Sequence, residues 1–259
     1  MAEEEKIREH AKQALKSLTN KKKKWKERLR DFLWEIFIIV VAINLTLWFH
    51  SWSDKKHDRE LEKNFLIGTR NDLSEVTQTL KNNLIFFQHV LDYYDSICTQ
   101  IDSHRIDKAY VDTNSWNLVE TMYFTFDNSR FENFKSSGYL RLIENDSLSK
   151  AITRLYTVRL PWEINKDEKT FDKRESNFMA YIGSRARIDS SGMMTVSNLL
   201  NAPEVQFHIK WQKILLNIDW KYQRKEAIQE VEQVINEIDQ ELKIRFNYEM
   251  KNTNEEINN

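Results

Sequence analysis

Three residues that follow the most apolar segment of the chain have the types and spacing of a metal site. His50, Asp54 and His57 stand at positions i, i+4 and i+7, so a helix would place them on one face. Zinc accepts imidazole nitrogens and carboxylate oxygens as ligands. The surrounding segment is rich in charged residues, and such a segment usually carries these side chains in contact with water. We therefore predict that no metal ion binds here.

Two aromatic groups could bind a ligand instead. Arg185 follows Tyr181 by four residues, and this pair could face an anion. Trp211, Trp220 and Tyr222 could line an apolar pocket. Aromatic residues at helical spacing belong more often to a hydrophobic core, and this is the interpretation that we favour for both groups.

Motifs of known catalytic mechanism are missing from the sequence. It has no glycine-rich phosphate loop, no HExxH motif, no paired cysteines and no GxSxG elbow. We therefore predict a protein that is not an enzyme, with no catalytic residue and no cofactor. The alternative, a membrane-anchored envelope enzyme, would need a deep pocket with titratable groups, for example around Arg185 and His208.

The elements that would position any site begin with an apolar run from Phe32 to Phe49. Roughly 18 residues at a rise of about 1.5 Å span about 27 Å, which is enough for the hydrocarbon core of a bilayer. We predict a transmembrane anchor over residues 32–52. Its notable residues are three interfacial tryptophans, a carboxylate near one end and an amide that needs a hydrogen-bond partner: Trp34, Trp48, Trp52, Glu35 and Asn44.

Basic residues are concentrated before this run. Lys21–Lys24, Lys26, Arg28 and Arg30 precede it, and the segment after it has fewer lysines and arginines. The positive-inside rule then puts the N-terminus in the cytoplasm and the residues after about 53 outside. We expect a single-pass protein of a bacterial inner membrane, with a periplasmic C-terminal domain and a lysine cluster that contacts membrane lipid.

The composition favours long helices. The chain has 259 residues but only four glycines and two prolines, and its net charge of −1 argues against a nucleic-acid partner. Cys98 is the single cysteine, so no internal disulfide is possible, and we expect a buried thiol on a helix.

Apolar residues recur at spacings of three and four from Leu66 to Ile101 and again from Val205 to Leu242. No glycine or proline separates Trp52 from Leu66, so the anchor helix should run on into the first of these stripes. We predict an all-α protein in which one transmembrane helix continues into an elongated antiparallel helical bundle. The expected parts are a basic N-terminal segment over 1–31, the anchor over 32–52, the bundle over 53–248 and a disordered tail over 249–259.

Shorter elements are expected between the two stripes. We predict a helix over 129–137, a helix from Asn145 that Pro161 kinks or divides, and a helical stretch over about 163–187. Pro203 should lie near the first position of the last helix.

Two segments resemble a Bacteroidetes-type family of uncharacterised single-pass membrane proteins, a domain of unknown function. One is Glu35–Val41 with Trp52 seventeen residues after the glutamate, and the other is Phe134–Leu148, which is similar to the pattern K-S-S-G-x-L-x-L-I-x-N-x-x-L. The family anchor resembles I-N-N-W at its end, where this chain has Phe49–Ser51 before Trp52. The resemblance spans about residues 28–160 and implies an architecture and a location, but no activity.

In physical terms the second segment describes a helix end. A helix would stop at Gly138, leucines would enter the core, and Asn145 would cap the next helix. The residues concerned are Ser136, Ser137, Gly138, Leu140, Leu142 and Asn145. A ligand-binding corner built on Ser136, Ser137 and Arg141 is the alternative.

The function that we predict is an interaction, scaffold or sensory module held at the membrane. An unbroken helix between anchor and bundle and the lack of catalytic motifs favour this class. A protein partner or a homo-oligomer is expected, since the N-terminal 31 residues are too short for a transducer domain. A mechanical spacer is a further alternative, and it predicts a rod without a pocket.

Overall fold

The structure, a computed structural model, describes residues 2–174 and 179–248, and about 81% of the chain is helical. The prediction of an all-α protein is therefore confirmed. Within the described residues the only strands that form a sheet are β1 (Arg187–Ile188) and β2 (Met194–Thr195), which pair antiparallel. The chain divides into two compact units, Met1–Glu60 and Leu61–Asn259, which we describe separately.

The first unit is helical throughout its described residues. Helix α1 (Ala2–Asp102) supplies it, and in the described part of the chain α1 is the one helix long and apolar enough to cross a membrane, by length and composition. The side chains from Phe32 to Trp52 are exposed, so this apolar run is not the core helix of the unit. The Asn44 amide donates a hydrogen bond to the Val40 carbonyl oxygen at 2.7 Å, within its own helix.

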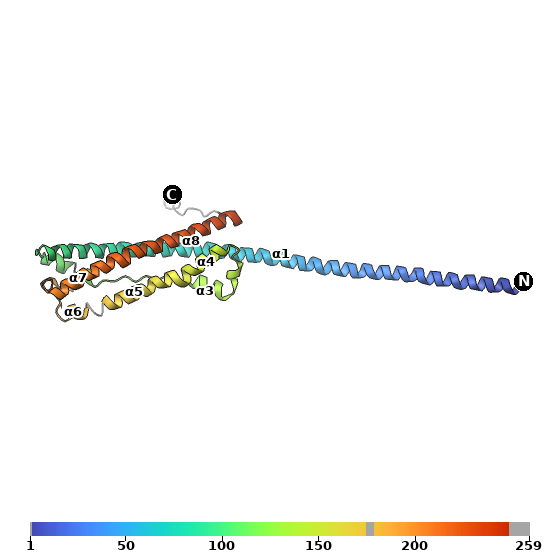
Figure 1. The fold of residues 1–259 in the computed structure, drawn as a ribbon, viewed down its shortest axis with the longest axis horizontal. Coiled ribbons are helices and arrows are strands. Elements are labelled where there is room, and N and C mark those ends of the chain that lie inside the picture. Colours follow the sequence, from blue (N-terminus) through green and yellow to red (C-terminus); the bar gives the residue numbers. More distant parts are fainter. Residues whose placement is uncertain (1, 175–178, 249–259) are drawn as a thin grey trace. The chain divides into compact units, whose positions relative to one another are not determined.

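The second unit contains the rest of α1 and a series of shorter helices (Figure 1). After α1, the longest helices of this unit among the described residues are α8, α5, α7 and α4. In chain order the elements are α2 (Lys108–Thr113), η1 (Ser115–Leu118), α3 (Ser129–Ser136), η2 (Tyr139–Leu142), α4 (Asp146–Arg154), the π-helical η3 (Leu155–Arg159), α5 (Leu160–Arg174), α6 (Ala180–Gly183), η5 (Ser197–Leu199), α7 (Pro203–Leu215), the π-helical η6 (Leu216–Tyr222) and α8 (Gln223–Phe246).

In this unit α1 runs antiparallel to α7 and α8, which lie alongside it in Figure 1. Ion pairs between the helices show this antiparallel arrangement. As the residue numbers along α1 increase, the residue numbers of the ion-pair partners on α7 and α8 decrease. They join Glu62 to Arg245, Arg70 to Asp239, Lys81 to Glu232, Asp95 to Lys213 and Asp102 to Lys210, at 2.5–3.3 Å. Most of these pairs are solvent-accessible and contribute little energy, so they report the register and the apolar core stabilises it.

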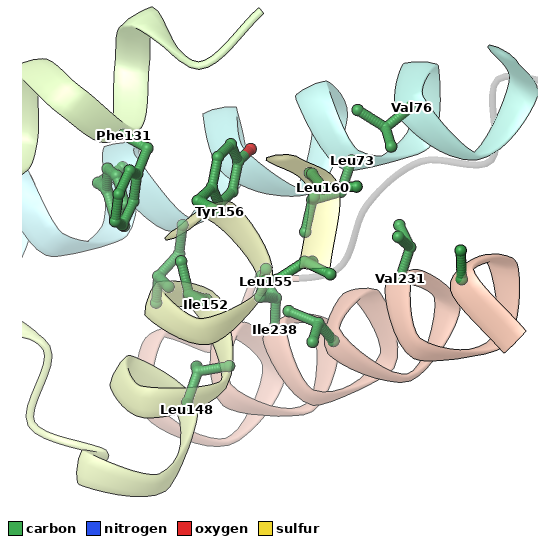
Figure 2. Packing of buried hydrophobic residues seen from close by; sticks show 14 of the residues in the cluster. Leu73, Val76, Phe131, Leu148, Ile152, Leu155, Tyr156, Leu160, Val231 and Ile238 are labelled. Atoms are coloured by element: carbon green, nitrogen blue, oxygen red, sulfur yellow. The ribbon is translucent and has the colours of Figure 1, made fainter. Parts of the chain in front are cut away.

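The core consists of two clusters of buried side chains. The first joins the beginning of this part of α1 to α3, α4, α5 and α8, and Figure 2 shows Leu73, Leu155 and Ile238 meeting there from three different helices. The second joins the end of α1 to α2, α6 and α7, and it includes the Cys98 thiol. Burial raises the pKa of Cys98, as expected for a thiol inside a helical core.

Several predicted boundaries need correction. The chain stays helical from Asp146 through Pro161, with the π segment η3 directly before the proline, so Pro161 does not divide the helix. The stretch expected over about 163–187 is helical in its described residues as far as Gly183, as α5 and α6, but Arg187 lies in a strand. The last helix does begin at Pro203, but η6 interrupts it. The tail over 249–259 lies outside the described residues.

The core predicts the cost of a cavity. Leu155 in η3 is 2% exposed, whereas Val158 in the same π segment is 59% exposed. Replacing Leu155→Ala should lower the free energy of unfolding by about 2–5 kcal/mol, because apolar contacts are lost and a void remains. Urea unfolding followed by circular dichroism measures this loss. Val158→Ala is the control and should change stability by less than about 0.5 kcal/mol; equal effects of the two would contradict the packing described here.

Candidate functional site

A groove of about 560 Å³ lies between the first turns of α1 in the second unit and helix α3. It is lined from α1 by Leu61, Asn64, Phe65 and Asp72, and from the other side by Asp127, Ser129, Arg130, Asn133, Phe134, Ser137 and Tyr139. A second cavity of about 550 Å³ shares Asp72 and Asp127 with it and continues along α1 past Glu75 and Thr79. We call the first of these cavities the α1–α3 groove.

Helical spacing explains how the sequence builds this groove. Asn64, Gly68 and Asp72 recur every four residues and therefore line one face of α1. Arg130, Asn133 and Ser137, at spacings of three and four residues, likewise share one face on and just after α3, while Phe131 and Phe134 on the same helix are buried. Each helix thus presents a polar row to the groove beside an apolar row that packs into the core.

Helix α3 has defined ends. Asp127 Oδ1 accepts hydrogen bonds from the Ser129 backbone N–H at 2.8 Å and from the Ser129 hydroxyl at 2.5 Å, which turns the chain into the helix. These bonds hold the pKa of Asp127 below its ordinary value. After α3 the chain reverses at Gly138, whose φ of 72° suits glycine, so the predicted helix end is confirmed.

An ion pair crosses the middle of the groove. Arg130 Nε lies 2.7 Å from Asp72 Oδ2, and its Nη2 lies 3.4 Å from Oδ1, so both carboxylate oxygens face the guanidinium. The hydrogen bond that Arg130 donates to the Asp72 carboxylate raises the pKa of Arg130. Gly68 makes this approach possible, because a Cβ at that position would collide with the guanidinium. A glycine inside a helix lowers the stability of the helix by about 0.5–1 kcal/mol relative to alanine. The close approach of Arg130 explains why a glycine stands at this position.

Aromatic rings border one end of the groove. Phe65 and Phe134 stack with ring centroids 3.8 Å apart, and Tyr139 meets Phe134 edge to face at 5.8 Å. Both phenylalanines are buried, whereas the Tyr139 side chain is 38% exposed. The groove therefore combines charged, amide and hydroxyl groups with one accessible aromatic ring.

The residues of the predicted helix-end signature have different positions. Ser137 lines the groove, but Ser136 donates to the Asn133 carbonyl oxygen within α3, and Arg141 is exposed on η2. Leu140 and Leu142 are half-buried against the first core cluster. Asn145 caps α4 by accepting from the Leu148 N–H, and its amide donates to Glu241 at 2.7 Å.

The other candidate residues lie apart from the groove. Among the described residues no group of His, Cys, Asp and Glu could hold a metal ion; His50 contacts Asp54 at 2.9 Å. Arg185 stacks over the Tyr181 ring at 4.3 Å and is exposed, with His208 6.1 Å from that ring.

The prediction that the downstream aromatics belong to the core is wrong for two of them. Trp211 and Tyr222 are 47% and 67% exposed, because they lie on the face of α7 and η6 that points away from the core. The side chain of Trp220 lies outside the described residues.

A buried ionic cluster is the feature that the sequence reasoning missed. Arg224 is buried at the start of α8 and contacts Glu163 at 2.8 Å and Asp167 at 2.8 and 3.0 Å. Both carboxylates are buried on α5, and Asp167 also accepts the Phe124 N–H at 2.8 Å. Burial raises the pKa of Asp167, against the opposing effect of Arg224. The only signal in the sequence is a charged residue at each of three core-facing positions.

We expect a large loss of stability when the cation of this ionic cluster is removed. Arg224→Leu should destabilise the fold by about 3–5 kcal/mol, because the buried Asp167 loses its ion-pair partner and Glu163 keeps only Arg159 and Lys166. The matched control is Lys225→Ala at the exposed neighbouring position. Adding Glu163→Gln and Asp167→Asn to Arg224→Leu should restore part of the stability in urea unfolding, and a further additive loss would contradict the electrostatic explanation.

Comparison with protein-family models, with curated proteins and with solved structures gives no match to this chain. The resemblance to the Bacteroidetes-type family therefore rests on the motifs around Glu35 and Gly138 alone. The groove and the ionic cluster are interpreted below from their own geometry.

Proposed function

We propose that the chain is a single-pass protein of a bacterial inner membrane whose helical domain is an interaction or sensory module. In this proposal the α1–α3 groove binds a neutral ligand rich in hydroxyl groups, such as a saccharide. The N-terminus is cytoplasmic and the helical domain periplasmic. Membership of the Bacteroidetes-type family of membrane proteins is part of the same proposal.

The exposure of the apolar run supports the membrane anchor. None of the side chains from Phe32 to Trp52 is buried within the protein, so lipid is the environment that would cover this apolar run. The Asn44 amide already has a donor bond inside its own helix, which lowers the cost of placing it in hydrocarbon. Trp34 and Trp48 are exposed near the two ends, where interfacial tryptophans are common.

The charges of the α1–α3 groove argue against an anionic ligand and are compatible with a neutral one. Asp72 and Arg130 compensate each other, and Asp127, which keeps its negative charge, already accepts two hydrogen bonds from Ser129. What remains for a ligand is a mixture of donors and acceptors on Asn64, Asn133 and Ser137. A sugar ring offers hydroxyls to such groups and an apolar C–H face to an aromatic ring such as Tyr139.

The same groove favours binding over the two alternatives. A mechanical spacer needs no cavity, and this domain has one that both α1 and α3 line. General acid catalysis in an envelope enzyme would need a proton donor whose pKa lies near neutral pH. Asp127 does not fit that role, because the Ser129 hydroxyl lowers its pKa.

Reporter fusions test the membrane topology. Alkaline phosphatase fused after Asn259 should be active, since it folds only outside the cytoplasm, and green fluorescent protein at the same place should be dark. The matched control is the same pair of reporters fused after Asp31, where both results should be reversed. An inactive phosphatase at Asn259 together with a fluorescent protein there would contradict the proposed orientation.

Gly68→Ala tests the groove without weakening the fold. The new methyl group should displace the Arg130 guanidinium, while the helix itself gains up to about 1 kcal/mol. Saturation-transfer NMR with neutral cell-envelope oligosaccharides should show binding that falls at least tenfold in this variant. Gly183→Ala is the control, because a Cβ there meets nothing within 4 Å. Binding of spermidine or inorganic phosphate in place of the sugars would contradict the proposed ligand class.

A further inference from the structure

Helix α7 and the π segment η6 expose a continuous row of large apolar side chains. The residues of this row, which we call the outer stripe, are Phe207, Trp211, Ile214, Ile218 and Tyr222, and they are 64%, 47%, 47%, 56% and 67% exposed. Their spacings are four, three, four and four residues. Alternation of four and three is the heptad spacing by which helices pair.

The outer stripe lies opposite the face that packs into the core. Val205, Ile209 and Leu216 are buried, and at about 100° per residue they point roughly half a turn away from Phe207 and Ile214. A surface helix of a folded domain normally has one apolar face. Helix α7 has two, of which the domain uses one.

The π turn keeps the outer stripe on one side of the helix. It inserts an extra residue, so Tyr222 rather than Lys221 continues the row after Ile218. At the other end of the stripe the rings of Phe207 and Trp211 are parallel within 4°, with centroids 6.4 Å apart. These two exposed rings offer apolar area against which another helix could pack.

We propose that the outer stripe pairs with the outer stripe of a second copy of this chain. A symmetric dimer places the same surface on both sides, and a heptad row is complementary to itself. The charges beside the stripe do not oppose this pairing, because Lys210 and Lys213 are neutralised within each copy by Asp102 and Asp95 of α1, each at 2.6 Å.

The size of the surface indicates how strong the pairing is. Five large side chains that are about half exposed bury on the order of 500 Å² per copy, or roughly 1,000 Å² in total. This area is at the lower limit for a specific interface. Pairing therefore depends on the high local concentration of copies in one membrane, and in this respect the inference rests on the proposed function.

Disulfide crosslinking of the full chain in native membranes tests the pairing. Cys98→Ala removes the single thiol, and Ile214→Cys adds one at the middle of the outer stripe, where it faces its own counterpart in either a parallel or an antiparallel pair. Copper–phenanthroline oxidation should convert most of this variant to a covalent dimer. Gln229→Cys, exposed on α8, is the matched control and should give at least fivefold less dimer.

The results separate this inference from the proposed membrane location. Crosslinking of Ile214→Cys no stronger than that of Gln229→Cys, in the membrane fraction, would overturn the dimer and leave the anchor in place. Crosslinking of Ile214→Cys to a different protein would overturn it as well. Recovery of the chain in the soluble fraction would refute the anchor. A dimer in that fraction would still support the pairing if the double substitution Trp211→Ser and Ile218→Ser abolished it.

Discussion

The second unit depends on the burial of one stripe of α1 against α8 and the helices before it. Leu66, Leu73 and Leu80 are fully buried at seven-residue intervals, so this single face of α1 organises the first core cluster. Each such side chain contributes about 1.5–3 kcal/mol on burial, far more than the exposed ion pairs that accompany it. The groove follows from the same arrangement, because the face of α1 next to this stripe carries Asn64, Gly68 and Asp72.

The sequence allowed prediction of those structural features that depend on a short pattern of residues. The spacing of the apolar residues gave the long helices, Gly138 gave the end of α3, and Pro203 gave the start of α7, since each depends on a backbone preference of a few residues. Helix α3 and the capping role of Asn145 belong to the same class. The π turns η3 and η6 could not be predicted, because the sequence pattern of apolar residues does not show where a residue is inserted into a helical turn.

The candidate site could be predicted only in small part. Ser137 was a candidate, but Asp72 and Arg130 are 58 residues apart, and no spacing within one helix indicates that they meet. The same holds for Arg224 and Asp167, which lie 57 residues apart on two helices. The outer stripe shows the opposite problem: its aromatics have core spacing, and the sequence cannot tell which of two apolar faces of α7 the domain covers.

The two π turns have a mechanical consequence for the helices that contain them. Arg159 in η3 contacts Glu163, and Arg224 stands two residues after the end of η6, so the residues of the ionic cluster lie within or soon after these π segments. If either turn relaxed to α geometry, the helix beyond it would rotate by about 100°, the angle of one residue. Such a rotation would separate opposite charges that are buried in the domain. The ion pairs of Arg224 with Glu163 and Asp167 therefore oppose a rotation of α5 relative to α8.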